Sequence, residues 1–230
     1  MSDTDSFIEE VSEEVRRDRM FDLFRRFGWI AVAAVLLLVG GAAWNEWSRS
    51  QQQTQAEALG DAVVAALQLE DAAQRAAALQ EIQSQTADGQ AMVQLLSAAE
   101  LTADNRASDA LMQLAAIRDN DEVQSIYRQI AAFKFLVIPN SGSSVEDRLS
   151  GLEALISSGS ALRVLAEEQL ALLDIDLGNE ADAVARLQRL LEDSEITPGL
   201  RRRVTQLITS LGATPGEAPI ETPGETPIDG

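Results

Sequence analysis

The sequence predicts an all-α protein, and three observations carry this prediction. Alanine, leucine, glutamine, glutamate and arginine dominate the composition, and the first proline is Pro139. The dominant residue types favour helices, whereas proline breaks them. Apolar residues recur at helical spacing, and no stretch shows the two-residue alternation of half-buried strands. We expect one transmembrane helix, then a tetratricopeptide-like solenoid of helical hairpins, then a disordered tail rich in proline and glycine.

Residues 1–26 are predicted to form a partly helical cytoplasmic lead. Ser6 and Glu9 have the spacing of a capping box, and Ile8, Val11 and Val15 then recur at helical spacing. Such a helix either runs along the membrane interface into the next segment or docks a cytoplasmic partner. We favour the first interpretation, because amphipathic spacing alone is common.

Residues 27–47 are predicted to be a transmembrane anchor. Residues 27–44 form a run of 18 uncharged residues. As a helix such a run spans ~27 Å, close to the ~30 Å hydrocarbon core of a bilayer. Tryptophans near both ends suit the two membrane interfaces. The side chains expected to form the anchor are Phe27, Trp29, Leu36, Leu37, Leu38, Trp44 and Trp47.

A cleaved signal peptide is the alternative for this segment. Gly41 and Ala43 fit a small-x-small cleavage rule, with the cut after Ala43. The apolar run is longer than the ~7–15 residues usual in signal peptides, and a long acidic lead precedes it. We therefore favour an uncleaved anchor. A buried core helix fits least well, because the segment is apolar on all sides.

Arginines flanking the span predict its orientation. Only Arg49 lies within the 20 residues that follow the span, whereas several arginines precede it. Cytoplasmic flanks are enriched in lysine and arginine, so the N-terminus is expected in the cytoplasm and the rest of the chain across the membrane. The arginines expected to set this topology are Arg16, Arg17, Arg19, Arg25 and Arg26.

Residues 48–212 are predicted to be a helical repeat domain. Turn-forming residues separate amphipathic segments throughout this region. Successive pairs starting near residues 88, 121 and 160 recur every 33 to 39 residues, which fits the ~34-residue tetratricopeptide period with insertions. The expected helices are 45–69, 71–86, 88–103, 106–118, 121–138, 146–157, 160–177, 180–194 and 199–211.

The clearest single repeat unit is residues 165–191. Its glycine falls at the expected turn between two helices, and small or apolar residues stand where the helices should approach. Glu167 and Asp174 occupy the places where the repeat usually has aromatic residues. The residues expected to pack the repeat are Leu170, Ala171, Gly178, Ala183 and Leu187.

Residues 213–230 are predicted to be a disordered, extended tail. The segments TPGEAPIE and TPGETPID form a near-perfect eight-residue duplication over 214–229. Proline and glycine at this density cannot build a core. A ligand motif for a partner is the alternative, and a solvated tail is the commoner case.

The residue inventory excludes many kinds of chemistry. Cysteine and histidine are both absent, so thiol nucleophiles, Ser-His-Asp triads and zinc sites built from these residues are excluded. The 37 acidic and 18 basic residues give a net charge of −19, which disfavours nucleic acid. The carboxylate pairs Glu167–Glu168 and Asp174–Asp176 are interpreted as a solvated helix face. We expect no enzyme, cofactor, metal or small-molecule substrate.

The layout resembles the ancillary Sec translocon subunits, tetratricopeptide-like inner-membrane proteins of Gram-negative bacteria. An Arg-flanked anchor after an acidic lead carries the resemblance, together with the closing segment ALRVLAEEQLALLDIDLGNEADAVARLQRLLEDSEITPGLRRRVTQLITSLG, residues 161–212. Its Leu-Gly-Asn turn and Pro-Gly-Leu-Arg-x-Arg helix entry are similar to those of alphaproteobacterial members. The resemblance implies an inner-membrane protein whose periplasmic repeat domain contacts the Sec machinery, periplasmic chaperones or exported clients.

The expected function is therefore protein–protein interaction by a membrane-tethered repeat domain. Tethering raises the effective concentration of the repeat surface near proteins that emerge at the membrane. The alternative is a structural or accessory subunit of another membrane complex, such as an envelope or energy-transducing assembly. The sequence assigns no residue to a partner-binding surface.

Overall fold

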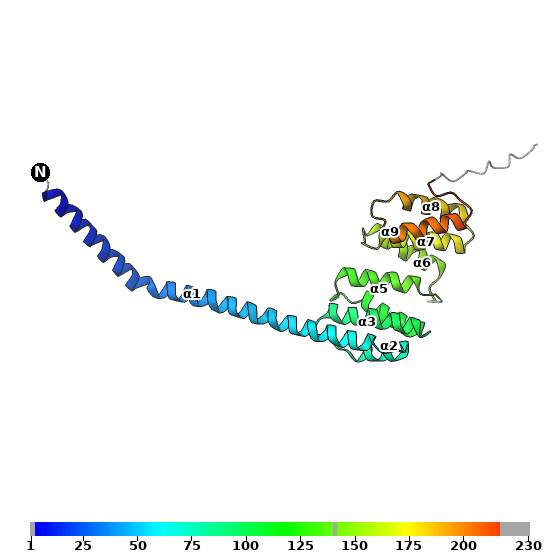
Figure 1. Cartoon of the computed structure of the whole chain (residues 1–230), viewed down its shortest axis with the longest axis horizontal. Coiled ribbons are helices and arrows are strands. Elements are labelled where there is room, and N and C mark those ends of the chain that lie inside the picture. The colour runs from blue at the N-terminus through cyan, green and yellow to red at the C-terminus, as the bar shows by residue number, and fades with distance from the viewer. Residues whose placement is uncertain (1–2, 140–141, 217–230) are drawn as a thin grey trace, which may run out of the picture. The chain divides into compact units, whose positions relative to one another are not determined.

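The computed structural model describes the backbone of residues 3–139 and 142–216, with side chains except at residues 3–29, 31, 32 and 35. All regular secondary structure in these ranges is α-helical, which confirms the all-α prediction. The helices, labelled in Figure 1, are α1 Asp3–Leu67, α2 Ala72–Glu81, α3 Ala87–Ala103, α4 Ala107–Arg118, α5 Ser125–Val137, α6 Val145–Ser157, α7 Arg163–Asp176, α8 Glu180–Glu192 and α9 Pro198–Ser210.

The chain divides into two units, Met1–Ala58 and Leu59–Gly230. The first unit contains α1 up to Ala58, and residues 59–67 of α1 belong to the second unit. Among the residues whose side chains are described, no helix has an apolar stretch long enough to cross a membrane. The predicted anchor, residues 27–47, includes residues 27–29, 31, 32 and 35, which lie outside that set.

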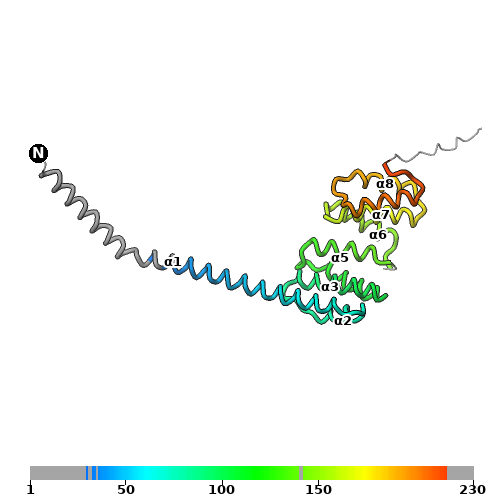
Figure 2. Tube along the Cα trace, viewed as in Figure 1, coloured from blue at the N-terminus to red at the C-terminus, as the bar shows by residue number. Residues whose placement is uncertain are grey.

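Each helix of the second unit packs chiefly against its neighbours in sequence. The chain passes from α2 to α9 in successive antiparallel layers, which the colour gradient of Figure 2 follows. Buried apolar side chains form a succession of clusters rather than one central core. Packing between adjacent elements is therefore the main tertiary interaction of this unit.

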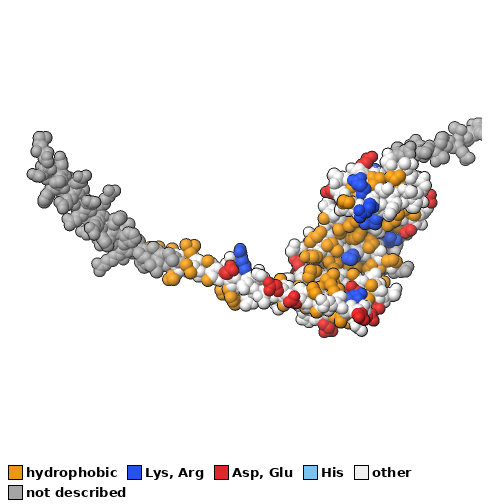
Figure 3. Space-filling model, viewed as in Figure 1, with side chains coloured by type: hydrophobic (Ala, Val, Ile, Leu, Met, Phe, Trp, Pro, Cys, Tyr) orange, Lys and Arg blue, Asp and Glu red, His pale blue; other side chains and the backbone are white. Residues whose placement is uncertain are grey.

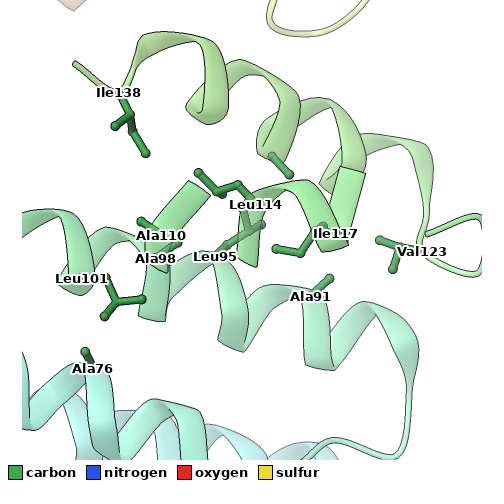
Figure 4. Packing of buried hydrophobic residues seen from close by; sticks show 11 residues of the cluster. Ala76, Ala91, Leu95, Ala98, Leu101, Ala110, Leu114, Ile117, Val123 and Ile138 are labelled. Atoms are coloured by element: carbon green, nitrogen blue, oxygen red, sulfur yellow. The ribbon is translucent and has the colours of Figure 1, made fainter. Parts of the chain in front are cut away.

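Four clusters follow one another along the second unit. The first joins the end of α1 to α2 and α3 through Val63, Leu79 and Val93. The second, drawn in Figure 4, brings Leu95 of α3 beside Leu114 of α4, with alanines where the helices approach closely. The third joins α5, α6 and α7 through residues that include Leu152 and Leu170, and the fourth joins α7, α8 and α9 through residues that include Leu187 and Val204.

Two predicted helices are shorter than expected by four or five residues at one end, for local reasons. The predicted helix 71–86 ends at Glu81, because Thr86 becomes the N-cap of α3 and its Oγ1 accepts a hydrogen bond from Gly89 N. The predicted helix 121–138 begins only at Ser125. The Asn120 side chain accepts a hydrogen bond from Glu122 N, which holds the preceding residues in a turn.

Candidate protein-binding groove

An open groove of about 630 Å³ lies between α5 and α6. Its apolar lining includes Phe135 and Leu136 of α5 and Leu155 of α6, while Arg118 at the end of α4 and Asp147 of α6 supply charge. Phe135 packs against the second cluster and Leu136 against the third. The groove therefore lies where the second and third clusters adjoin.

A close approach of α5 and α6 shapes one part of this groove. A Cβ atom built on Gly151 would lie 2.8 Å from both methyl carbons of Leu136. No side chain fits there unless Leu136 moves. Glycine is unfavourable inside a helix, and at this position it lets the Leu136 side chain lie directly against the backbone of α6.

Arg118 presents a fixed guanidinium at the groove. Its Nε and Nη2 donate hydrogen bonds of 2.8 and 2.9 Å to the two carboxylate oxygens of Asp119. Its Cζ lies 5.0 Å from the centroid of the Phe135 ring, in cation–π contact. These hydrogen bonds raise the pKa of Arg118 and lower the pKa of Asp119. These contacts orient the guanidinium beside the aromatic ring of Phe135.

Asp147 is also held in place, by the N-terminus of α6. Its backbone N–H donates to Ser144 Oγ at 3.0 Å, and Ser144 N donates to its Oδ2 at 3.3 Å. This capping box holds a carboxylate at the groove. The groove therefore combines an apolar floor with two oriented charges of opposite sign, an arrangement suited to a peptide segment.

Hydrophobic side chains also gather on the surface of the second unit. Figure 3 shows them over the middle of this unit, in the region of α3, α5 and α6. Ile126 of α5 and Leu149 of α6 are among the exposed large apolar residues of the second unit. Contiguous exposed apolar surface is typical of protein interaction sites.

The carboxylates interpreted as a solvated face are paired with arginines instead. Glu168 is only 5% exposed and accepts hydrogen bonds of 2.8 and 2.7 Å from Nε and Nη2 of Arg203. Arg186 lies 3.1 Å from both Glu167 and Asp174. The interpretation was wrong for these three, because their partners lie on other helices; Asp176 is exposed as expected.

The five residues expected to pack the repeat lie at the α7–α8 hairpin. Leu170, Ala171, Ala183 and Leu187 are buried, with Ala171 and Leu187 in the fourth cluster and Leu170 in the third. Gly178 follows α7 with φ at 78°, the left-handed conformation that favours glycine.

Part of the expected anchor can be placed in the structure. Leu36, Leu37 and Leu38 are 67, 77 and 74% exposed on α1. The rings of Trp44 and Trp47 are also exposed, and their centroids lie 5.4 Å apart. The side chains of Phe27, Trp29, Arg16, Arg17, Arg19, Arg25 and Arg26 lie outside the described residues.

Comparison with known protein families, curated proteins and solved structures finds no match to this chain. The groove is therefore identified from the structure of this chain alone. Sequence reasoning missed it, since it assigned no binding residue. One signal was present, namely Gly151 inside a predicted helix, because an interior glycine often marks a close approach of another element.

Proposed function

We propose that the protein is a single-pass, tetratricopeptide-like membrane protein whose second unit binds segments of other proteins. The groove between α5 and α6 carries this proposal. Its apolar floor suits large apolar side chains of a partner, and its fixed Arg118 and Asp147 suit charges that flank them. The chain's net charge of −19 favours a partner with basic residues beside its apolar ones.

The anchor is supported by the composition of residues 27–44 and by the exposure of their described side chains. Leu36, Leu37, Leu38 and Val39 occupy consecutive positions, so they point in all directions around α1, and all four are exposed. A helix that is apolar on every side requires an apolar environment. We place residues 1–26 in the bacterial cytoplasm and the second unit in the periplasm, where Sec components, chaperones or exported clients would be its partners.

The groove can be tested by filling it. Ala154 is exposed and lines the groove, so Ala154→Trp should block it without disturbing a buried residue. Ser157→Trp is the matched control, because Ser157 is exposed on the same helix and lies outside the groove lining. Crosslinking with mass spectrometry in native membranes should show partner loss for the first variant and retention for the second.

Three further variants separate the contribution of the membrane span from that of the groove. An unrelated apolar span of equal length in place of residues 27–44 should preserve the partners, whereas deletion of residues 88–212 should abolish them. Deletion of residues 213–230 should matter little for them. If the variant with the swapped span loses the partners and the variant lacking residues 88–212 keeps them, the protein is a laterally packed subunit of another complex and the proposal fails.

A further inference from the structure

The side chain of Gln188 holds the start of the C-terminal tail against α8. Gln188 Nε2 donates a 2.8 Å hydrogen bond to the carbonyl of Thr214, and Gly216 N donates a 2.8 Å bond to Gln188 Oε1. One carboxamide thus binds two backbone groups that flank Pro215. Paired donor and acceptor bonds of this kind recognise backbone geometry rather than a particular side chain.

The Thr-Pro-Gly sequence suits this contact. Pro215 has no backbone N–H, so no donor is left unpaired between the two bonds. Gly216 has φ at 83°, a backbone angle that residues other than glycine rarely adopt. Proline followed by a glycine at positive φ is the pattern of a type II turn. Proline and glycine therefore fit this contact at these two positions.

The residues just before the turn bring it to Gln188. Ala213 packs against the fourth cluster, and its N–H donates to the carbonyl of Ile208 at 3.1 Å. The tail begins from a fixed point on α9, and its first Thr-Pro-Gly lies directly after that point.

The same triplet recurs eight residues later, at 222–224. Both copies are followed by glutamate and, three residues after the glycine, by proline. A third Thr-Pro-Gly, at 197–199, instead begins α9, with Thr197 as the N-cap. Leucine and three arginines follow that copy and continue a helix, whereas the prolines after the tail copies disfavour one.

We propose that the surface of α8 at Gln188 is a binding site for a Thr-Pro-Gly turn, and that residues 222–224 are its second occupant. Eight residues, 214–221, separate the fixed Ala213 from the second copy and reach up to ~26 Å when extended, enough to loop out and return to the same place. Loop closure disfavours the second copy only modestly, since its cost rises slowly with length. The first copy dominates, and the second binds when the first is released.

The chain itself offers a clean test, because it contains no cysteine. Spin labels on Asp182→Cys, exposed on α8, and on Glu225→Cys would report the second copy by electron–electron distance measurement on the full chain in detergent micelles. Labels on Asp182→Cys and Glu217→Cys provide the reference distribution for the first copy. We expect a narrow distribution for residue 217 and a broad one for residue 225.

Gly216→Val should exchange the two copies, because valine is strained at φ 83°. The residue 225 label should then give the narrow distribution that residue 217 gives in the otherwise unchanged chain. Adding Gly224→Val or Gln188→Leu should broaden it again. Circular dichroism would verify that each variant retains its helices.

Three results would overturn the proposal. The first is a residue 225 distribution that stays broad in Gly216→Val. The second is a residue 225 distribution that stays narrow when Gln188→Leu is added to Gly216→Val, which would place the tail at another surface. The third is loss of the narrow distribution when labelled chains are diluted with unlabelled ones, which would make a second molecule the occupant.

Discussion

Gly178 illustrates how one residue ends a helix and turns the chain. Its N–H donates to the carbonyl of Ile175 at 3.0 Å, and Asn179 N donates to that of Asp174 at 2.8 Å. This pair of bonds is the Schellman motif, which places the residue after the C-cap in the left-handed conformation. Gly212 repeats the motif after α9, with φ at 77°.

Replacing Gly178 with valine should destabilise the second unit by about 1 kcal/mol or more. A Cβ atom at this position would meet no atom within 4 Å, so the cost comes from the backbone conformation alone. Urea denaturation followed by circular dichroism would measure it. Gly199→Ala is the matched control, because Gly199 also has open space around it and lies in helical α9. An equal loss in the control would contradict the explanation.

Between helices, the pair of Glu168 and Arg203 joins α7 to α9. The carboxylate is buried, whereas the Arg203 side chain is 53% exposed, so water screens the pair from one side. The hydrogen bonds raise the pKa of Arg203. Another groove, of about 510 Å³, is lined by this pair and by further residues of α7 and α9.

Removing only the arginine should cost more than removing both charges. We expect Arg203→Met to destabilise the protein by about 1–3 kcal/mol, because it leaves a buried carboxylate without its donors. Adding Glu168→Met should recover part of that loss. Urea midpoints of the two single variants and the double variant form the cycle. No recovery in the double variant would show that Arg203 acts through its aliphatic packing.

Another arginine, Arg163, links α7 to the segment between α8 and α9. Nη1 and Nη2 of Arg163 donate to the carboxylate of Asp193 at 2.7 and 2.9 Å, and Nη2 also donates to Glu195 at 2.6 Å. The arginine hydrogen bonds, and then the backbone N–H of Glu195, lower the pKa of Asp193. Folding therefore favours the ionised carboxylate.

The stability that Asp193 contributes should be lost in acid. Because its pKa is lower in the folded state, the contribution is complete above the ordinary aspartate pKa of ~3.9 and disappears as the pH falls through the lowered value. Asp193→Asn should be less stable than the natural sequence at pH 6, with the gap closing towards pH 2. Urea midpoints across this range would measure it. Asp176→Asn, at an exposed position, is the control and should keep the urea midpoint of the natural sequence at pH 6.

Local signals predicted the helices well and the contacts between them poorly. Expected and observed bounds of α3, α4, α6 and α9 agree to within one residue, because caps and turn residues act locally. The pairing of Glu168 with Arg203 joins residues 35 positions apart. Neither that pair nor the Gly151–Leu136 approach at the groove follows from spacing along one helix, so tertiary packing alone determines them.

For the molecule as a whole, the topology is the central prediction. A reporter active only outside the cytoplasm, fused after Leu211, should be active if the N-terminus is cytoplasmic, as the arginines before residue 27 predict. N-terminal sequencing of the mature protein should find Met1 or Ser2. A mature protein beginning at Trp44 would instead establish cleavage and release of the second unit.

Trp44 and Trp47 lie next to each other on α1, so the intrinsic tryptophan signals of the protein report on this helix. Trp29, Trp44 and Trp47 are the three tryptophans of the chain, and its one tyrosine, Tyr127, lies on α5 against the second cluster. Tryptophan fluorescence therefore arises from the first unit alone, and the wavelength of its emission maximum depends on how exposed these indole rings are to water. The indole rings of Trp44 and Trp47 lie 5.4 Å apart, so their electronic transitions couple. Their near-ultraviolet circular dichroism therefore reports, without any added label, whether this part of α1 remains helical.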